Sequence, residues 1–391
     1  MKALAGRTIL QVIPDLSAGG AERTTIEVAE AIVAAGGRAL VASRGGRLEA
    51  ALQGVGGEVI HMDAATKSPR RIWANSRQIA LLVRSEGIDL IHARSRAPAW
   101  SALWAARATK VPFVTTYHGA YNARSGLKRL YNSVMARGDM VIANSAWIGE
   151  HIHITHGTPR DRIVVIPRGV DLTRYHPGQV IGARLEAARR SFGLSPQERT
   201  VILLPARLTR WKGHPEAIDA FAMLNGDVRA SCVLIFAGDA QGREDYVAGL
   251  MRQAERLGVA RQLRILGHVD DIPAALMACD LIIAPSIEPE AFGRAVAEAS
   301  AMAIPVVGAD HGGARETIIH NETGLRVEPG NAQALAAAMQ AVLSMDAGRR
   351  RAMGLAGQEF IRRTFSTAAL QESTVKVYVC LLDQSDGAEA A

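Results

Sequence analysis

Two glutamates, Glu290 and Glu298, have the type and spacing of residues that bind a polyhydroxylated ligand. The apolar run from Leu281 to Ala284 predicts a buried parallel strand, and the alanine-rich segment from Ala291 to Ala303 predicts the following helix. Glu290 is then expected in the loop before this helix and Glu298 in about its second turn, both at the carboxyl end of a sheet. Each carboxylate can accept two hydrogen bonds from a vicinal diol, so a sugar ring and a ribose are natural ligands. The alternative is a pair of solvated acids near a helix start.

Three further segments accompany this pair in a fixed order. A predicted strand, Thr200 to Leu204, leads into residues 205–214, which contain Arg207, Lys212 and Gly213. Residues 304–316, with adjacent glycines at 312 and 313, and residues 321–327 follow downstream. Together the segments resemble the retaining, nucleotide-sugar-dependent glycosyltransferases with the GT-B fold, which bacterial envelope mannosyl- and glucosyltransferases typify. The resemblance covers nearly the whole chain, but its specific part is the C-terminal half.

The resemblance implies roles for individual residues around the donor. Glu290 would hold hydroxyls of the donor sugar and Glu298 the ribose diol. The backbone amides of Phe292 and Gly293 would meet sugar and phosphate at the positive end of the helix dipole. Val269 occupies the position whose main chain meets the base, although an edge strand would explain this segment equally well.

A sugar nucleotide leaves behind a diphosphate whose negative charge grows as the glycosidic bond breaks. Many enzymes neutralise it with a divalent metal, but the sequence contains no clear Asp-x-Asp metal motif. Arg207, as a bidentate fork, and Lys212, as a point charge, fit the alternative of two fixed cations. The resemblance assigns both to the diphosphate, so neither a metal nor another cofactor is expected.

The N-terminal half contributes a glycine pair and a histidine. Gly19 and Gly20 lie between a predicted strand and helix, where backbone amides can approach a diphosphate. A simple tight turn is the alternative. His118 ends the predicted strand from Val111 to Tyr117 and matches the family's histidine near the reacting sugar. Since this retaining chemistry has no evident enzymic nucleophile, His118 is predicted to position the sugar rather than to act as a base.

Arg168 departs from the resembling family, which usually has Asn at this position. The residue follows the predicted strand from Ile163 to Pro167 and so lies near the end of the first domain. It either adds positive charge toward phosphate or an anionic acceptor, or it is an exposed loop arginine.

Other functions are compatible with the same fold. A GT-B epimerase should show additional acid and base side chains around the sugar, and a phosphorylase should show a lysine linked to pyridoxal; neither has a distinct signature here. A non-catalytic sugar-nucleotide-binding subunit is disfavoured because the four charged donor residues occur together. A nicotinamide dehydrogenase is disfavoured because Gly19 and Gly20 lack the G-x-G-x-x-G spacing.

Strands, loops and helices alternate along the chain, which predicts parallel sheets covered on both faces. A chain of 391 residues also exceeds what one core usually supports. The expected architecture is α/β of the GT-B type, with two doubly wound Rossmann-like domains facing a cleft. Expected strands cover residues 8–13, 38–42, 89–93, 111–117, 140–144 and 163–167 in the first half, and 200–204, 232–238, 262–266, 281–284 and 305–308 in the second.

Residues 1–180 are predicted to form the N-terminal acceptor domain and residues 197–365 the nucleotide-sugar domain. The polar stretch 181–196 would link them. By resemblance, a last helix at about residues 366–382 crosses back and completes the first domain.

Charge is unevenly distributed. Residues 1–190 contain 26 Lys and Arg against 14 Asp and Glu, a net charge of +12, whereas the remainder contains 19 against 24, a net of −5. In residues 124–135, Leu127, Leu130 and Tyr131 recur at helical spacing beside Arg124, Lys128 and Arg129; Arg70, Arg71, Trp73 and Arg77 form a second basic group. Basic residues flanking an apolar helical face suit an anionic membrane surface. The alternative is an ordinary amphipathic helix packed on its own domain.

Nucleic acid is disfavoured as a partner because only 5% of residues are aromatic and no nucleic-acid motif is recognisable. No apolar run reaches about 18 residues, and the N-terminus does not resemble a signal peptide. Cys232, Cys279 and Cys380 lie far apart without metal-ligand spacing, as expected for thiols in a reducing compartment. The expected location is the cytoplasm, at the inner face of the cytoplasmic membrane. The expected acceptor is lipopolysaccharide or another envelope glycan.

Overall fold

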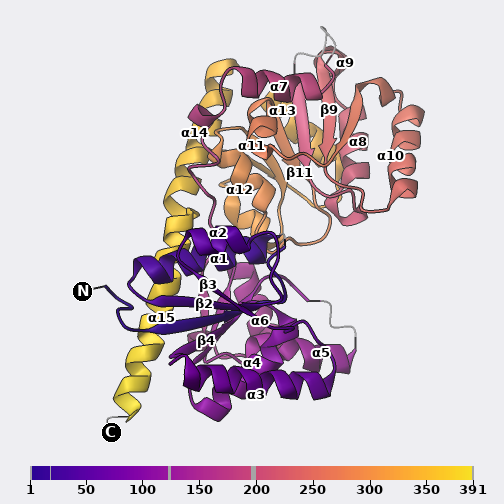
Figure 1. Cartoon of the computed structure of the whole chain (residues 1–391). Helices are drawn as coiled ribbons and strands as arrows, with labels where there is room; N and C mark the ends of the chain where they lie inside the picture. Colours follow the sequence, from indigo (N-terminus) through magenta and orange to yellow (C-terminus); the bar gives the residue numbers. More distant parts are fainter. Residues whose placement is uncertain (1, 18, 122–124, 195–199, 390–391) are drawn as a thin grey trace. The chain divides into compact units, whose positions relative to one another are not determined.

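The computed structural model describes residues 2–17, 19–121, 125–194 and 200–389, which form two compact α/β units (Figure 1). Unit 1 comprises Met1–Arg168 and Thr367–Ala391, and unit 2 comprises Gly169–Ser366. Each unit contains one wholly parallel sheet. The prediction of two doubly wound, Rossmann-like domains is therefore confirmed.

The sheet of unit 1 has the strand order β3-β2-β1-β4-β5-β6-β7. Its strands are β1 (Thr8–Val12), β2 (Arg38–Ser43), β3 (Glu58–His61), β4 (Leu90–Ala93), β5 (Phe113–Tyr117), β6 (Met140–Ala143) and β7 (Ile163–Val165). Its helices are α1 (Gly20–Ala34), α2 (Glu49–Gly54), α3 (Pro69–Ser85), α4 (Arg96–Thr109), α5 (Gly126–Ser133), α6 (Ala146–His156) and α15 (Thr367–Glu389). The order reverses between β1 and β4, and ligands of open α/β sheets bind at the carboxyl ends of strands beside such a reversal.

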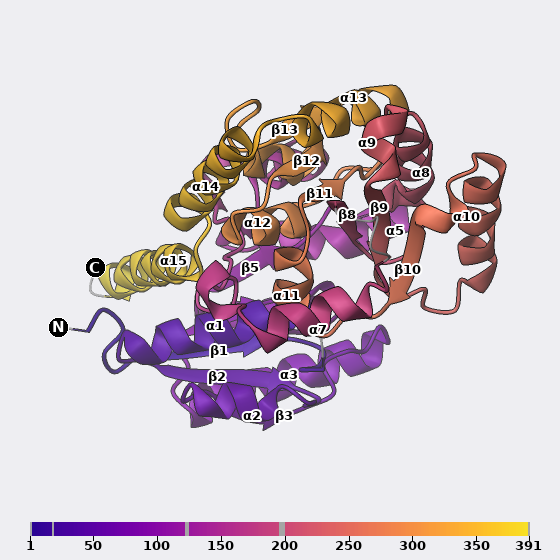
Figure 2. The same cartoon turned by 90° about the horizontal axis from the view of Figure 1, so that it is seen from above.

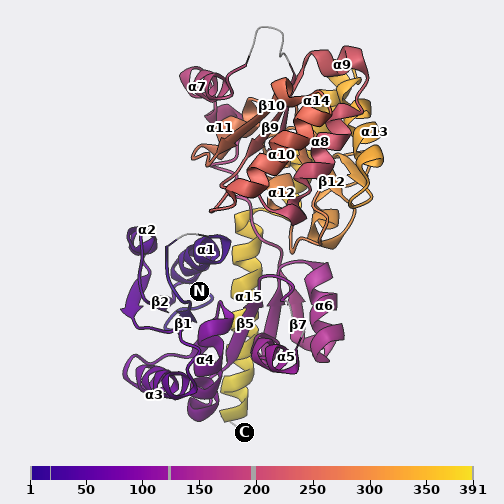
Figure 3. The same ribbon diagram turned by 90° about the vertical axis from the view of Figure 1, so that its right-hand side faces the viewer.

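Helices cover both faces of this sheet, with α1 and α2 on one side and α3 and α4 on the other (Figure 3). The central strands β1, β4 and β5 are buried along their whole length, as expected for parallel strands between two helix layers. The last helix, α15, packs beside α1. Its buried Tyr378 hydroxyl lies 2.5 Å from Nδ1 of His92 in β4, so the C-terminal helix is fixed to the centre of unit 1.

The sheet of unit 2 has the order β10-β9-β8-β11-β12-β13. Its strands are β8 (Thr200–Pro205), β9 (Cys232–Ala237), β10 (Leu263–Gly267), β11 (Leu281–Ala284), β12 (Val306–Ala309) and β13 (Leu325–Val327). Its helices are α7 (Ala183–Ser191), α8 (His214–Ala222), α9 (Gly226–Ala230), α10 (Glu244–Arg256), α11 (Ile272–Met277), α12 (Arg294–Ala301), α13 (Ala332–Leu343) and α14 (Ala347–Thr364). Figure 2 shows α11 and α12 on one side of these strands and α8 and α10 on the other.

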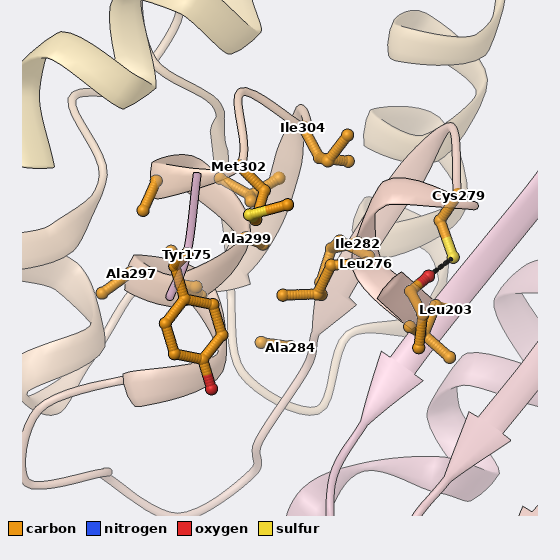
Figure 4. Packing of buried hydrophobic residues seen from close by; sticks show 14 of the residues in the cluster. Tyr175, Leu203, Leu276, Cys279, Ile282, Ala284, Ala297, Ala299, Met302 and Ile304 are labelled. Carbon is orange, nitrogen blue, oxygen red and sulfur yellow. Dashed lines mark hydrogen bonds between the residues drawn. The ribbon is translucent and has the colours of Figure 1, made fainter. Parts of the chain in front are cut away.

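Alternate residues of β8 enter two different cores, because successive side chains of a strand point to opposite faces. Val201 and Leu203 join a cluster with α11 and α12, whereas Ile202 and Leu204 join a cluster with α8, α10 and α13. Figure 4 shows part of the first cluster, in which Leu203 of β8, Ile282 of β11 and Met302, just after α12, are labelled. Burial on both faces explains why these strands appear in the sequence as uninterrupted apolar runs.

Two strands, β3 and β13, were not predicted from the sequence. Both lie at the edges of their sheets and are short, and both include residues that are only partly buried. A charged or polar residue in each, such as Glu58 or Arg326, interrupts the apolar pattern on which a strand prediction depends.

Two predicted boundaries also need correction. The structure divides the chain at Arg168–Gly169, earlier than the predicted domain end at residue 180. The predicted linker 181–196 contains α7, which packs on α11 within unit 2; its residues 195 and 196 lie outside the described residues. The polar residues of α7 suggested a linker, but one of them holds the helix in unit 2. Arg184 forms a bidentate ion pair with Asp271, with N–O distances of 2.6 and 2.7 Å.

Candidate functional site

Lys212 and Glu290, which are 78 positions apart in the sequence, form an ion pair in unit 2. Lys212 ends the 3₁₀ helix Arg210–Lys212 after β8, and Glu290 lies in the loop after the neighbouring strand β11. The amide of Ile287 donates to the carbonyl of Trp211 at 2.8 Å and joins the two loops. Lys212 Nζ lies 2.8 Å from Glu290 Oε1, and each side chain is only 13% exposed. The Ser286 hydroxyl donates to the same carboxylate oxygen.

Close backbone packing fixes the loop that contains Glu290. The 3₁₀ helix Gly312–Thr317 lies against this loop, and the amide of Gly313 donates to the carbonyl of Glu290 at 2.7 Å. Gly293 has a φ of +80°, and a Cβ atom there would lie 2.6 Å from Cα of Ala314. Only glycine combines this conformation with this approach. Gly312 and Gly313 belong to one of the motifs of the sequence but had no predicted role, and their role in positioning Glu290 is visible only in the fold.

Gly293 also corrects the predicted start of the helix. α12 begins at Arg294 rather than at Ala291, because Gly293, with its positive φ, is the N-cap residue of the helix. Phe292 is buried, and its ring packs edge-to-face on Phe365 with the ring centroids 5.6 Å apart. The Phe292 side chain is therefore part of the core, and only its backbone is available for the predicted ligand contact.

Glu298 lies in the second turn of α12 and is 8% exposed. One carboxylate oxygen accepts from Nε of Arg294 at 2.5 Å. Burial, together with the adjacent Glu298 carboxylate, raises the pKa of the Tyr175 phenol. Glu298 is thus a buried acceptor whose orientation is set by two side chains, neither of which the sequence identified as its partner.

Arg207 and Val269 lie in other loops of unit 2. Arg207 follows β8 and is exposed, and it makes no ion pair with any residue of the described ranges. The loop is held where the Leu208 amide donates to the Asp239 carbonyl at 3.1 Å. Val269 follows the edge strand β10 and is half-buried. No hydrogen bond or ion pair joins either residue to the Lys212–Glu290 pair in the described structure.

In unit 1, Arg168 approaches both the glycine pair and His118, the two features predicted for the N-terminal half. Gly19 caps the N-terminus of α1, and a Cβ atom at Gly20 would collide with the guanidinium of Arg168. Arg168 Nη2 also lies 3.4 Å from His118 Nδ1. Arg168 is therefore partly buried, unlike the exposed loop arginine of the second interpretation.

His118 is held neutral by this environment. Burial is the main cause that lowers its pKa well below the ordinary value, and the charges of Arg168 and Arg94 lower it further. A guanidinium can only donate, so the neutral imidazole accepts through Nδ1 in its contact with Arg168. Nε2 of His118 is buried and has no hydrogen-bond partner among the described residues.

Arg94, which the sequence analysis did not select, lies directly after β4 and is 2% exposed. Burial lowers the pKa of its guanidinium to about 10. Its Nη1 donates to the Thr116 hydroxyl at 3.4 Å, and Nε and Nη2 have no partner among the described residues. A charged residue at the carboxyl end of a predicted strand was the signal available in the sequence.

Known proteins resemble the chain over both units. The family model "Glycosyl transferases group 1" matches residues 187–360, and the model "Glycosyltransferase Family 4" matches residues 18–174. A solved glycosyltransferase from Rickettsia africae ESF-5 is 34% identical and has a TM-score of 0.87, with 96% of this chain and 98% of that chain covered. The Anabaena protein HepE, solved in complex with UDP and glucose, is 25% identical with a TM-score of 0.81, covering 95% and 99%.

Among curated proteins, the D-inositol 3-phosphate glycosyltransferase of Nocardia farcinica is 32% identical over 66% of this chain and 56% of its own length. The chain thus spans little more than half the length of this relative.

Proposed function

Since the chain belongs to the group 1 glycosyltransferases, we propose that it transfers a hexose from a nucleoside diphosphate sugar to an acceptor with retention of configuration. The observation that carries this proposal is the Lys212–Glu290 pair at the carboxyl ends of two adjacent strands. A carboxylate there can bind sugar hydroxyls while the adjacent ammonium meets a phosphate oxygen.

The remaining donor contacts are proposed from the resemblance to this family. Glu298 binds the ribose diol, the backbone of Phe292 and Gly293 meets the sugar and phosphate, and Val269 contacts the base through its main chain. Arg207 is free to move onto the diphosphate because it has no ion-pair partner in the described part of unit 2. Gly19 and Gly20 bring backbone amides to the diphosphate, and His118 donates to the sugar.

Two cations, Lys212 and Arg207, stabilise the leaving diphosphate, so the proposed transfer needs no divalent metal. The HepE complex with UDP and glucose makes UDP-glucose the first donor to test. Hydrolysis and transfer should be measured with a panel of UDP-, GDP- and ADP-sugars, with and without EDTA. Turnover that survives EDTA with one donor class supports the proposal. Release of an epimerised nucleotide sugar, phosphorolysis, or binding without turnover would instead identify an epimerase, a phosphorylase or a non-catalytic subunit.

We propose a glycan or glycolipid of the cell envelope, such as a growing lipopolysaccharide, as the acceptor. Counted on the structural units, unit 1 contains 23 basic and 16 acidic residues, a net charge of +7, and unit 2 contains 22 of each. The excess of positive charge in unit 1 supports an anionic acceptor presented at the inner face of the cytoplasmic membrane. The name of the Nocardia relative adds a phosphorylated inositol as a second acceptor to test. In the described ranges, no helix has the length and apolarity needed to cross a bilayer.

A further inference from the structure

Unit 1 contains a cavity of about 910 Å³ that the proposed donor site does not use. The cavity is lined by α3, α4 and α5 and by the loops that follow β4 and β5; the three helices can be located in Figure 1. Its volume falls in the range of about 300–1,000 Å³ that small-molecule sites occupy. Six large side chains are among the residues that line it: Trp100, Trp104, Tyr121, Leu127, Leu130 and Tyr131.

The walls of this cavity present apolar surface because their polar atoms bond to one another. Trp100 Nε1 donates to the Tyr131 carbonyl at 3.2 Å. Arg96 donates to Asn132 Oδ1 at 2.9 Å, and its guanidinium lies 4.0 Å from the ring centroid of Tyr121. Leu127, at 82% exposed, and Leu130, at 54%, lie at the solvent side. Exposed apolar side chains that border an apolar cavity indicate a binding surface rather than a folded core.

Cations surround this apolar space. Lys67, Arg96 and Lys128 are among the residues that line it, and the described lining includes no acidic residue. Neither Lys67 nor Lys128 forms an ion pair within the described ranges. The cavity therefore matches a ligand with a long apolar part and a negatively charged end.

The position of the cavity relates it to the proposed reaction. Ser95 and Arg96 follow β4, while Ala120 and Tyr121 come two and three residues after His118. The cavity therefore adjoins the carboxyl edge of the unit 1 sheet where His118 lies. We propose that it receives the hydrocarbon chain of a lipid-linked acceptor, whose phosphate lies at Lys67 and Lys128. This inference rests on the proposed glycosyl transfer and names the chemical class of its acceptor.

Calorimetry with decyl phosphate, below its critical micelle concentration, tests the proposal on the full chain. Saturable binding is expected, and affinity should rise about fourfold for each methylene added between octyl and decyl phosphate. Ethyl phosphate should not bind measurably, and neutral decyl glucoside should bind at least tenfold more weakly than decyl phosphate. Leu127→Asp should weaken decyl phosphate binding at least tenfold. The matched control is Leu81→Asp, which changes a 64% exposed leucine of α3 outside the cavity and should leave the affinity unchanged.

Absence of saturable binding, or an equal loss in both leucine variants, would overturn the proposal. Equal affinity for decyl glucoside would reject the anionic end of the ligand, and binding of a soluble glycan in competition with decyl phosphate would assign the aromatic walls to sugar instead. Donor hydrolysis by the wild-type chain separates the two proposals. If a nucleotide sugar is hydrolysed but decyl phosphate does not bind, only the lipid site is wrong. If decyl phosphate binds but no donor is hydrolysed, the proposed transfer is wrong.

Discussion

Lys212 and Glu290 form an ion pair, so the ligand contacts of each depend on the other. The pair is largely shielded from water, so its charges interact more strongly than those of a surface pair. A donor that binds at this pair must share the carboxylate with the ammonium. Arg207 differs because it is exposed and forms no ion pair within the described ranges; its contact with the diphosphate is part of the proposed function.

Replacing either cation should impair the departure of the leaving group. Lys212→Ala and Arg207→Ala should each lower kcat/KM by roughly two to four powers of ten, because a charge that stabilises the transition state is lost. Arg210→Ala is the matched control: it lies in the same 3₁₀ helix, but its guanidinium pairs with Glu216 at 2.6 Å. Steady-state kinetics with and without EDTA measures both effects. An Arg210→Ala variant as slow as Lys212→Ala, or an activity that needs magnesium, would contradict this assignment.

The two glutamates should separate sugar binding from nucleotide binding. Glu290→Gln should reduce transfer while the affinity for the free nucleoside diphosphate is retained, because its proposed contacts are to the sugar. Glu298→Gln should weaken both transfer and the affinity for the nucleoside diphosphate. It should also lower the temperature of thermal unfolding, because Arg294 loses its buried partner. Calorimetric titration with UDP measures the affinity. Equal losses of UDP affinity in the two variants would show that the sugar and ribose assignments are wrong.

Stability should fall as the pH falls below about 6.5, the ordinary histidine pKa. His92 and His118 have folded-state pKa values well below that of the unfolded chain, chiefly because both are buried. The unfolded chain therefore binds more protons in this window, and the free energy of unfolding decreases by up to about 1.4 kcal/mol per pH unit for each histidine. Denaturant unfolding from pH 5 to 8 measures this slope. In His118→Gln, one proton fewer is taken up on unfolding, so the slope of the free energy of unfolding against pH should be smaller. An unchanged slope would mean that His118 titrates normally when folded.

At the scale of elements, the conformation of the loop between β11 and α12 depends on glycines at the starts of the adjoining helices. Gly293 separates β11 and its loop from α12, and the Gly312–Thr317 helix packs directly on the backbone of that loop. Backbone contacts therefore fix the loop that contains Glu290, and Lys212 and Ser286 then hold its side chain.

Gly293→Ala should destabilise unit 2 and displace Glu290. Both the positive φ and the approach to Ala314 oppose a side chain there, so a loss of about 2–4 kcal/mol in the free energy of unfolding is expected. Gly258→Ala is the matched control, since its φ is +70° but its Cβ would meet nothing within 4 Å. It should cost about 1–2 kcal/mol. Urea unfolding provides the comparison, and equal losses in the two variants would rule out the backbone collision as a cause.

At the scale of the whole molecule, the structure changes the charge balance inferred from the sequence. Because α15 brings acidic residues to unit 1 and the arginines of α7 belong to unit 2, the units carry +7 and 0 rather than +12 and −5. Unit 1 still carries all of the net charge. Lys128 and Arg129 are exposed on α5, Trp73 is exposed on α3, and Arg124 lies outside the described residues.

Binding of the full chain to vesicles should therefore require anionic lipid and weaken as salt increases, because salt screens exposed charges. Changing Arg124, Lys128 and Arg129 together to Ser should reduce co-sedimentation further. Arg252 and Arg256 of α10, changed together to Ser, are the control in the neutral unit. Equal binding to neutral vesicles, or none to either kind, would favour a soluble acceptor.

The sequence by itself determined the fold class, and it predicted which residues bind the donor. Apolar runs such as Leu281–Ala284 predict parallel strands because both faces of such strands are buried, and Glu290 and Glu298 could be placed relative to the following helix because their spacing is local. Edge strands such as β3 and the helix α7 were not predicted, because their local sequence patterns are weak. Pairing with a neighbouring strand and packing on α11, respectively, stabilise them in the fold.

Only the tertiary structure decided which of these residues meet. The Lys212–Glu290 pair, the approach of Arg168 to His118 and the return of α15 to unit 1 join segments that lie far apart along the chain. The order of strands in a sheet and the packing of helices on it determine such contacts, and neither is a property of a local sequence pattern. For the same reason the burial of Arg94, and the neutral state it helps to impose on His118, became evident only when the strands were assembled.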